Sequence, residues 1–281
     1  MTQPPSTYDC PPTLTDTQVL EFCKQGFLML ESVVPDEVNQ RAIDYLNQDT
    51  HYEPMGILEQ DWFIENVICN SEAVGVVRSL LGRDFLLPVL MSNHRRQCPW
   101  TSQGGWHVEG GTIYEPGFNH ILVFYLPQDT PVEMGPTEVL PGSHHFMSQQ
   151  RFMAHLGNIK GAVRTAAPAG SIFMADYGIW HRAAGGSGIG TRDMLKYMYW
   201  RTTPPTRDWL IEPDFDLAHT NYEEGVKEFG EQFRTSLDVA RLFVWLTGKG
   251  DHYKHDGGQA WPLPARRIGT PFGFPAELSN W

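Results

Sequence analysis

From about residue 85 to residue 202 the chain is made of short apolar runs separated by glycine and proline, and this pattern limits its fold more than any other feature. Turn-forming clusters such as Pro127-Gln128-Asp129 stand between the runs. Short runs with such punctuation are typical of the strands of a β-sandwich or a β-barrel. We expect the clearest strands over residues 85–92, 121–126, 137–140, 171–175 and 194–200.

Helical patterns precede the strands. Thr15 has the character of an N-cap, with Gln18 three positions later completing a capping box, and Gly26 supplies a stop for this first helix. The apolar spacing that follows predicts two more helices before the β region begins. These further elements are expected as a strand over 27–30 and as helices over 36–47 and 71–81.

The character changes again after residue 202. Residues 222–246 predict a helix, because apolar residues recur there every three or four positions. Such a helix can cover the core, close over a substrate or join two copies of the chain, so a homodimer through 222–246 is one expectation. We expect a single domain over 1–281, with helical support in 1–84, a β core in 85–202 and a helix and tail in 203–281.

Charge and composition exclude several kinds of partner. The 281 residues include 33 acidic and 21 basic side chains, for a net charge of −12, and the basic residues form no run. Nucleic acid and anionic membrane surfaces are therefore disfavoured as partners. No stretch approaches the roughly 18 apolar residues of a membrane span, and the four cysteines show no metal or disulfide spacing. We expect a cytoplasmic protein with reduced thiols.

The stretch Trp106-His107-Val108-Glu109 carries the first sign of chemistry. In an extended strand, side chains two residues apart project the same way, so His107 and Glu109 share one side. A second imidazole from His181 would complete a set of two histidines and one carboxylate. Such a set leaves three adjacent coordination positions of a metal ion open, as in non-haem Fe(II) oxygenases.

Arg192 follows His181 by eleven residues. If His181 ends one strand and Arg192 begins the next, with residues 185–188 turning between them, both side chains enter the same cavity. A guanidinium beside the metal would bind a carboxylate through two parallel hydrogen bonds. An acidic co-substrate is therefore indicated.

With these residues the sequence resembles the phytanoyl-CoA dioxygenase-like family of Fe(II)/2-oxoglutarate-dependent dioxygenases. The resemblance covers most of residues 14–202 and rests on four stretches. They are the helix leading into residues 25–30, the Trp-His-x-acid site, the string Gly135-Pro136-Thr137-Glu138-Val139-Leu140-Pro141-Gly142-Ser143-His144, and residues 170–192.

The resemblance implies a mainly β fold with flanking α-helices around a double-stranded β-helix, the cupin-like jelly roll. It makes His107, Glu109 and His181 the ligands of Fe(II), although the family usually has Asp where this chain has Glu109. Arg192 would pair with the distal carboxylate of 2-oxoglutarate, and Gln97 and Thr112 are weaker candidates for contacts with it. His144 and His145 are expected to have structural roles in a turn.

The same resemblance implies an oxidoreductase that consumes O2 and 2-oxoglutarate. It would hydroxylate an unactivated C–H bond of a small organic molecule, with secondary metabolites among the candidates, and release succinate and CO2. Two other classes stay open. A cupin-like metal-dependent isomerase or hydrolase would use the triad without 2-oxoglutarate, and a relative without catalytic function would serve in binding.

Overall fold

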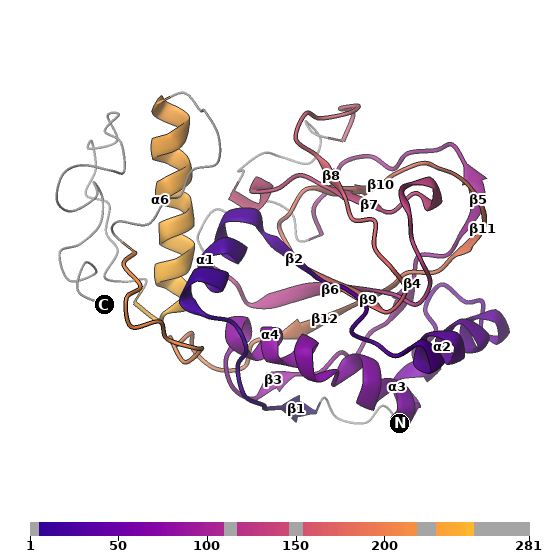
Figure 1. Cartoon of the computed structure of the whole chain (residues 1–281), viewed down its shortest axis with the longest axis horizontal. Coiled ribbons are helices and arrows are strands. Elements are labelled where there is room, and N and C mark those ends of the chain that lie inside the picture. Colours follow the sequence, from indigo (N-terminus) through magenta and orange to yellow (C-terminus); the bar gives the residue numbers. More distant parts are fainter. Residues whose placement is uncertain (1–5, 110–116, 146–153, 218–228, 250–281) are drawn as a thin grey trace.

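The computed structural model describes residues 6–109, 117–145, 154–217 and 229–249, with side chains of the last helix from residue 238 on. The strands form a double-stranded β-helix, or jelly roll, in which a large antiparallel sheet lies against smaller sheets, and helices cover the outer side of the large sheet (Figure 1). The mainly β fold with flanking helices is as predicted.

The large sheet has seven strands, in the order β1-β3-β12-β6-β9-β2, with β4 also paired to β12. At its centre β6 is antiparallel to both β9 and β12. Its strands are β1 Thr7–Tyr8, β2 Phe27–Leu30, β3 Phe85–Leu86, β4 Ser92–Asn93, β6 His120–Leu126, β9 Ser171–Asp176 and β12 Leu195–Trp200.

The second layer consists of a three-stranded sheet, in the order β10-β7-β8, and a two-stranded ribbon of β11 and β5. All of its pairings are antiparallel. Its strands are β5 Arg96–Trp100, β7 Thr137–Val139, β8 Val163–Arg164, β10 His181–Ala183 and β11 Gly186–Arg192.

The first helix begins and ends where its capping residues predict. The Thr15 side chain and the Gln18 side chain form the reciprocal capping box, and Gly26 ends the helix in the left-handed region at φ 77°. The helices are α1 Asp16–Gln25, α2 Asp36–Gln48, α3 Asp61–Phe63, α4 Ser71–Leu81 and α6 Phe229–Leu246. Short 3-10 or π turns span Met55–Glu59, Ile64–Ile68, Val132–Met134 and Ser143–His145.

Alternation along β6 separates the two faces of the large sheet. Ile121, Val123 and Tyr125 belong to the core that the helices cover, whereas Leu122 and Phe124 belong to the core between the two layers. Because successive side chains point to opposite faces, every second residue of the central strands faces the interior of the jelly roll. That interior face is the floor of the candidate site.

Two predictions of local structure outside the candidate ligands are wrong. The strand expected over 85–92 is split, with β3 ending at Leu86 and β4 starting at Ser92; Pro88 lies between and has no N–H to donate to a sheet. Residues 186–188 are not a turn but the start of β11, which pairs with β5 through a register shift between Gly186 and Gly190. A strand so rich in glycine has no apolar alternation to reveal it.

The segment after β12 is fastened to α1 through one buried carboxylate. Asp16 is fully buried and accepts two hydrogen bonds from Arg207, both of 2.8 Å, and one from the Trp209 indole. It also accepts from the backbone N–H of Glu212 at 2.7 Å. α6 then packs against α1 (Figure 1), and Ala240 and Val244 of the predicted apolar stripe are fully buried.

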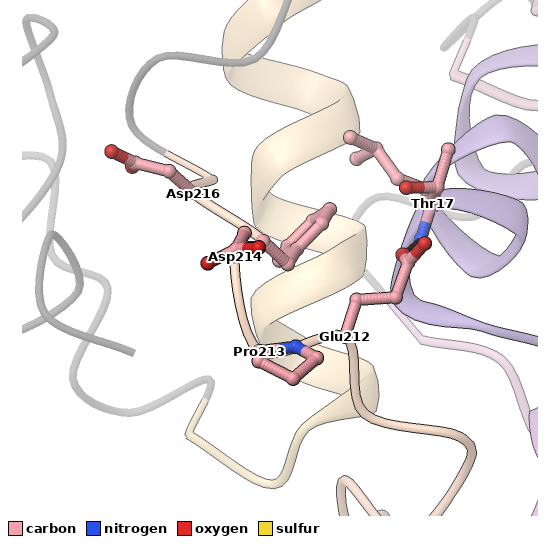
Figure 2. Close-up of a pocket in the computed structure, with 7 residues that line it drawn as sticks. Thr17, Glu212, Pro213, Asp214 and Asp216 are labelled. Atoms are coloured by element: carbon pink, nitrogen blue, oxygen red, sulfur yellow. Dashed lines mark hydrogen bonds between the residues drawn. The ribbon is translucent and has the colours of Figure 1, made fainter.

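A hollow of about 590 Å³ lies where this segment meets α1. Thr17 of α1 lines it, together with Glu212, Asp214 and Asp216 (Figure 2). The candidate metal ligands do not line this hollow. No helix among the described residues is both long and apolar enough to cross a membrane.

Candidate metal centre

His107 and His181 lie directly opposite one another on two neighbouring extended segments. The backbone N–H of each donates to the carbonyl oxygen of the other, both at 3.0 Å, which makes an antiparallel bridge. The two ring centroids are 4.3 Å apart. His181 therefore begins β10 rather than ending a strand, as was expected.

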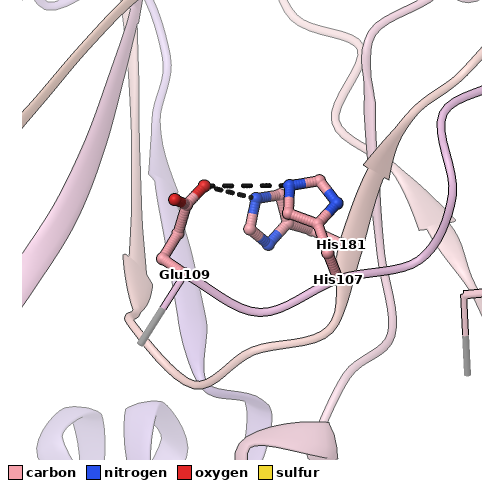
Figure 3. A group of neighbouring side chains, drawn as sticks. All are labelled: His107, Glu109 and His181. Carbon is pink, nitrogen blue, oxygen red and sulfur yellow. Dashed lines mark hydrogen bonds and ion pairs between the residues drawn. The ribbon is translucent and has the colours of Figure 1, made fainter. Parts of the chain in front are cut away.

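The residues around His107 alternate as the sequence predicts. Trp106 and Val108 are buried and pack with Leu140 and Trp180. His107 and Glu109 point to the other side, toward His181 (Figure 3). The extended backbone thus delivers two of the three candidate ligands from one short segment.

Hydrogen bonds fix the tautomer of both imidazoles. Nδ1 of His107 lies 2.9 Å from the carbonyl oxygen of Gly105, and Nδ1 of His181 lies 3.0 Å from that of Ile179. A carbonyl only accepts, so each Nδ1 carries the proton and each Nε2 keeps a lone pair. Histidines that bind metals are oriented in this way.

Glu109 completes the group. Its Oε1 lies 3.2 Å from Nε2 of His181 and 3.8 Å from Nε2 of His107 (Figure 3). One ligand atom from each of the three residues lies within 4.8 Å of the others, and no other such group occurs among the described residues. Bonds of about 2.1 Å to one ion place neighbouring ligand atoms about 3 Å apart, so the carboxylate of Glu109 is close enough to both imidazoles to be the third candidate ligand.

The charge states of this group suit a cation. Burial raises the pKa of Glu109, but the neighbouring side chains of His181 and Lys196 outweigh this effect and hold the pKa well below its usual range. Burial, together with neighbouring His181, lowers the pKa of His107. A carboxylate and neutral imidazoles are the forms that bind a metal ion.

Lys196, on β12, was not singled out from the sequence. Its ammonium group makes a short ion pair with Oε1 of Glu109. Lys196 lies opposite Phe124 on β6 and alternates with buried Leu195 and Tyr197, so it points into the interior of the jelly roll. The signal in the sequence was a lysine within an otherwise apolar strand.

Arg192 ends β11 instead of beginning a strand, and its guanidinium is buried. One terminal nitrogen donates to the carbonyl oxygen of Gly135 at 2.6 Å and the other to that of His94 at 3.2 Å, while Nε has no partner among the described residues. Burial and the nearby Arg96 lower the pKa of Arg192 to about 10. The side chain remains a cation at neutral pH.

His94 lies beside Arg192, because its carbonyl oxygen accepts from the Arg192 guanidinium at 3.2 Å. Burial, then Lys196 and Arg192, lower the pKa of His94 to about 4, while Glu109 acts in the opposite direction. The Nε2 atom of this neutral ring lies 3.2 Å from the hydroxyl of Tyr52. The charges of Lys196, Arg192 and Glu109 thus all act on this one imidazole.

The weaker candidates lie elsewhere. Gln97 is exposed on β5, and its Oε1 accepts from the Thr191 hydroxyl at 2.9 Å. Thr112 lies outside the described residues. Nε2 atoms of His144 and His145 both lie against the carbonyl oxygen of Cys23, at 3.0 and 2.8 Å, in the expected turn.

A buried ion pair stands behind the two imidazoles. Arg182, next to His181, donates to Oε2 of Glu138 at 2.6 Å, and its guanidinium lies 4.6 Å from the centre of the Trp106 ring. Arg182 and Trp106 also both donate to the carbonyl oxygen of Gly157. The neighbours of both histidines are thus held in one network on the side away from the site.

Comparison with known proteins bears on the fold. No model of a protein family matches the chain, and no curated protein matches it in sequence. Among solved structures, HygX from Streptomyces hygroscopicus with nickel, 2-oxoglutarate and hygromycin B bound is 13% identical, with a TM-score of 0.54 over 70% of this chain and 90% of that chain. HygX with iron bound has a TM-score of 0.55 at 15% identity, over the same shares of both chains.

Two structures from nogalamycin biosynthesis are also similar. The non-haem α-ketoglutarate-dependent epimerase SnoN is 14% identical, with a TM-score of 0.53 over 66% of this chain and 82% of that chain. The corresponding carbocyclase SnoK is 15% identical, with a TM-score of 0.51 over 71% and 90%. At such identities the likeness establishes the shared jelly-roll fold, and function has to be argued from the site.

Proposed function

We propose that this protein is a non-haem Fe(II)/2-oxoglutarate-dependent oxygenase that acts on a C–H bond of a small organic molecule. The observation that carries the proposal is the convergence of ligand atoms from His107, Glu109 and His181 within 4.8 Å on a jelly roll. Two histidines and one carboxylate leave adjacent positions on the ion for a chelating co-substrate and O2. The two imidazoles, whose Nδ1–H groups are held by backbone carbonyl oxygens, and the ionised carboxylate suit the binding of such an ion.

Arg192 fits a dicarboxylate co-substrate. It is a buried guanidinium whose Nε has no partner among the described residues, and a buried cation favours a bound anion. We propose that Arg192 binds the distal carboxylate of 2-oxoglutarate. The carbonyl oxygens of Gly135 and His94 accept hydrogen bonds from its two terminal nitrogens and so orient the guanidinium. Gln97 and Thr112 are weaker candidates for further contacts with the co-substrate.

When bound, Fe(II), 2-oxoglutarate and O2 supply the oxidising power that removes hydrogen from an unactivated C–H bond, with succinate and CO2 as co-products. The chain's own residues orient the candidate ligands and exclude water from the site. The hydrogen bonds to Gly105 and Ile179 keep both Nε2 lone pairs directed at one point. Phe124 packs edge-on against His181 with ring centroids 6.0 Å apart and helps to exclude water there.

The substrate is proposed to be a small molecule, with secondary metabolites the preferred class. HygX is described with hygromycin B bound, and SnoN and SnoK come from nogalamycin biosynthesis. SnoN is an epimerase and SnoK a carbocyclase, so epimerisation and cyclisation are rivals of hydroxylation for this chain. Within the superfamily, the Gly135–His144 string and the His181-to-Arg192 spacing favour the phytanoyl-CoA dioxygenase-like family.

Slow turnover without a substrate tests the proposal. The purified protein is incubated with Fe(II), 2-oxoglutarate and O2, and succinate is measured by NMR. We expect succinate from the wild type and none above background from His181→Ala. A protein that retains iron, forms no succinate and turns over a substrate without O2 would instead be the isomerase or hydrolase that the triad also permits.

A further inference from the structure

Lys196 presents a cation inside the jelly roll, where a charge requires a partner. Its side chain is 17% exposed, and its neighbour across the strand pair is Phe124. A charge in apolar surroundings is retained only when it is paired. Among the described residues, the carboxylate that pairs with Lys196 is that of Glu109.

The same oxygen atom is needed twice. Oε1 of Glu109 accepts from Lys196 and is also the oxygen that lies 3.2 and 3.8 Å from the two imidazole Nε2 atoms. A divalent ion held by His107, His181 and Glu109 would draw on this oxygen, and the ammonium of Lys196 competes with it. When the ion is bound, it neutralises the charge of Glu109, which is the carboxylate that pairs with Lys196 among the described residues. The ammonium group of Lys196 then lies beside the ion without a bound anion.

We propose that Lys196 is a second anion-binding residue of the site and that it pairs with the carboxylate at the metal-chelating end of the 2-oxo acid. The inference rests on the proposed function and assigns a different carboxylate of the co-substrate to each of the two basic residues. Lys196 contacts a metal ligand directly, whereas Arg192 contacts the carbonyl oxygens of Gly135 and His94. In this arrangement Lys196 pairs with the chelating carboxylate of the dianion and Arg192 with the distal one.

Charge balance supports this assignment. A divalent ion with ionised Glu109 and two neutral histidines has one net positive charge, and Arg192 and Lys196 add two more. A dianionic co-substrate offsets two of these three charges, and Lys196 places a cation of the protein beside the metal-bound carboxylate. Lys196 thus contributes to affinity for the anion at the expense of affinity for the metal ion.

The test uses Co(II), which binds such sites without oxidising, and two anions. Oxalate has only the chelating end, whereas 2-oxoglutarate also has the distal carboxylate. The affinities for Co(II), then for each anion on the Co(II)-loaded protein, are measured by calorimetry for wild type, Lys196→Met, Lys196→Arg and Arg192→Met. Lys24→Met, which removes the same charge from α1 where Lys24 pairs with Glu21, is the control.

Lys196→Met should bind Co(II) as tightly as wild type or up to about tenfold more tightly, because a competing cation is gone. It should bind oxalate at least about tenfold more weakly, because a charged hydrogen bond is lost. Lys196→Arg should recover most of the oxalate affinity. Arg192→Met should weaken binding of 2-oxoglutarate and leave the affinity for oxalate unchanged. Lys24→Met should change none of these affinities.

Opposite changes in one variant separate a direct contact from structural support. If Lys196→Met weakens the binding of both Co(II) and oxalate, Lys196 merely positions Glu109 and the inference is overturned. Unchanged oxalate affinity in Lys196→Met, with wild-type binding of Co(II) and 2-oxoglutarate, also overturns the inference and leaves the proposed function standing. A His181→Ala variant that binds Co(II) as tightly as wild type would overturn both this inference and the proposed function.

Discussion

At the scale of single residues, the charge of Glu109 is central to the site. Glu109→Gln keeps the size of the side chain and removes the charge, so we expect affinity for Co(II) to fall by about 100-fold or more, beyond what loss of a supporting contact costs. Glu109→Asp keeps the charge and should retain most of the affinity. Glu133→Gln, at an exposed position, is the matched control in the same calorimetric titration. Equal affinities for Glu109→Gln and wild type would remove Glu109 from the ligand set.

Asp176, at the end of β9, gives a second residue-scale prediction. Burial raises its pKa from 3.8 to about 6, so the folded state binds a proton more tightly than the unfolded state does. Stability from this group is present at low pH and lost as pH rises from about 4 to about 6, by up to about 3 kcal/mol. Burial lowers the pKa of the adjacent His145 to about 3, so that ring is neutral in this window.

Asp176→Asn keeps an acceptor for the Gly178 N–H, which lies 2.7 Å from Oδ1, and removes the titration. The difference in unfolding free energy between this variant and wild type should grow in the variant's favour from pH 4 to pH 6 and then level off. Chemical denaturation at several pH values measures it. A difference that stays constant from pH 4 to pH 8 would contradict the raised pKa.

At the scale of elements, Asp16 joins the first helix to the segment after β12. Asp16→Ala removes four hydrogen bonds and leaves the buried Trp209 indole without its acceptor, so we expect a loss of about 2–4 kcal/mol in the free energy of unfolding. Asp36→Ala changes an exposed residue in the first turn of α2 and should cost less than about 1 kcal/mol. Similar losses in both variants would mean that the contacts of Asp16 contribute little.

Elements were predictable where the determinants are local. The side chain of Thr15 and the left-handed φ of Gly26 fix the ends of α1 within a few residues of chain, and the central strand β6 was found from its apolar run. β11 escaped prediction because its glycines give no pattern, and its pairing with β5 depends on distant residues. The bridge between His107 and His181 is equally non-local. The sequence pattern singled out both histidines as candidate ligands but did not predict that they lie opposite one another.

The missed residue of the site has a physical explanation. Lys196 lies in a strand that was identified correctly, but a sequence does not say which face of a strand meets a metal site. The pairing of Lys196 with Phe124 places it on the interior face, and the segment that carries His107 brings Glu109 to it. A charged residue within an apolar strand is therefore a signal of a site even before its partner is known.

At the scale of the whole molecule, the oligomeric state is a separate prediction. The sequence suggests a homodimer through residues 222–246, while the buried face of α6 from Val239 to Val244 packs within the chain against residues such as Trp209 and Phe215. We keep the homodimer as a proposal, for which light scattering should give a mass near twice 31.9 kDa. A mass near that of one chain would contradict it.

The most direct test of the account is the visible spectrum of the protein under anaerobic conditions, recorded with Fe(II) and then with 2-oxoglutarate added. We expect wild type to develop a weak charge-transfer band on addition of 2-oxoglutarate. The band should be absent in His181→Ala and weakened in Arg192→Met. Tight binding of iron without any band on addition of 2-oxoglutarate would contradict the proposed oxygenase and favour a metal enzyme that uses no 2-oxo acid.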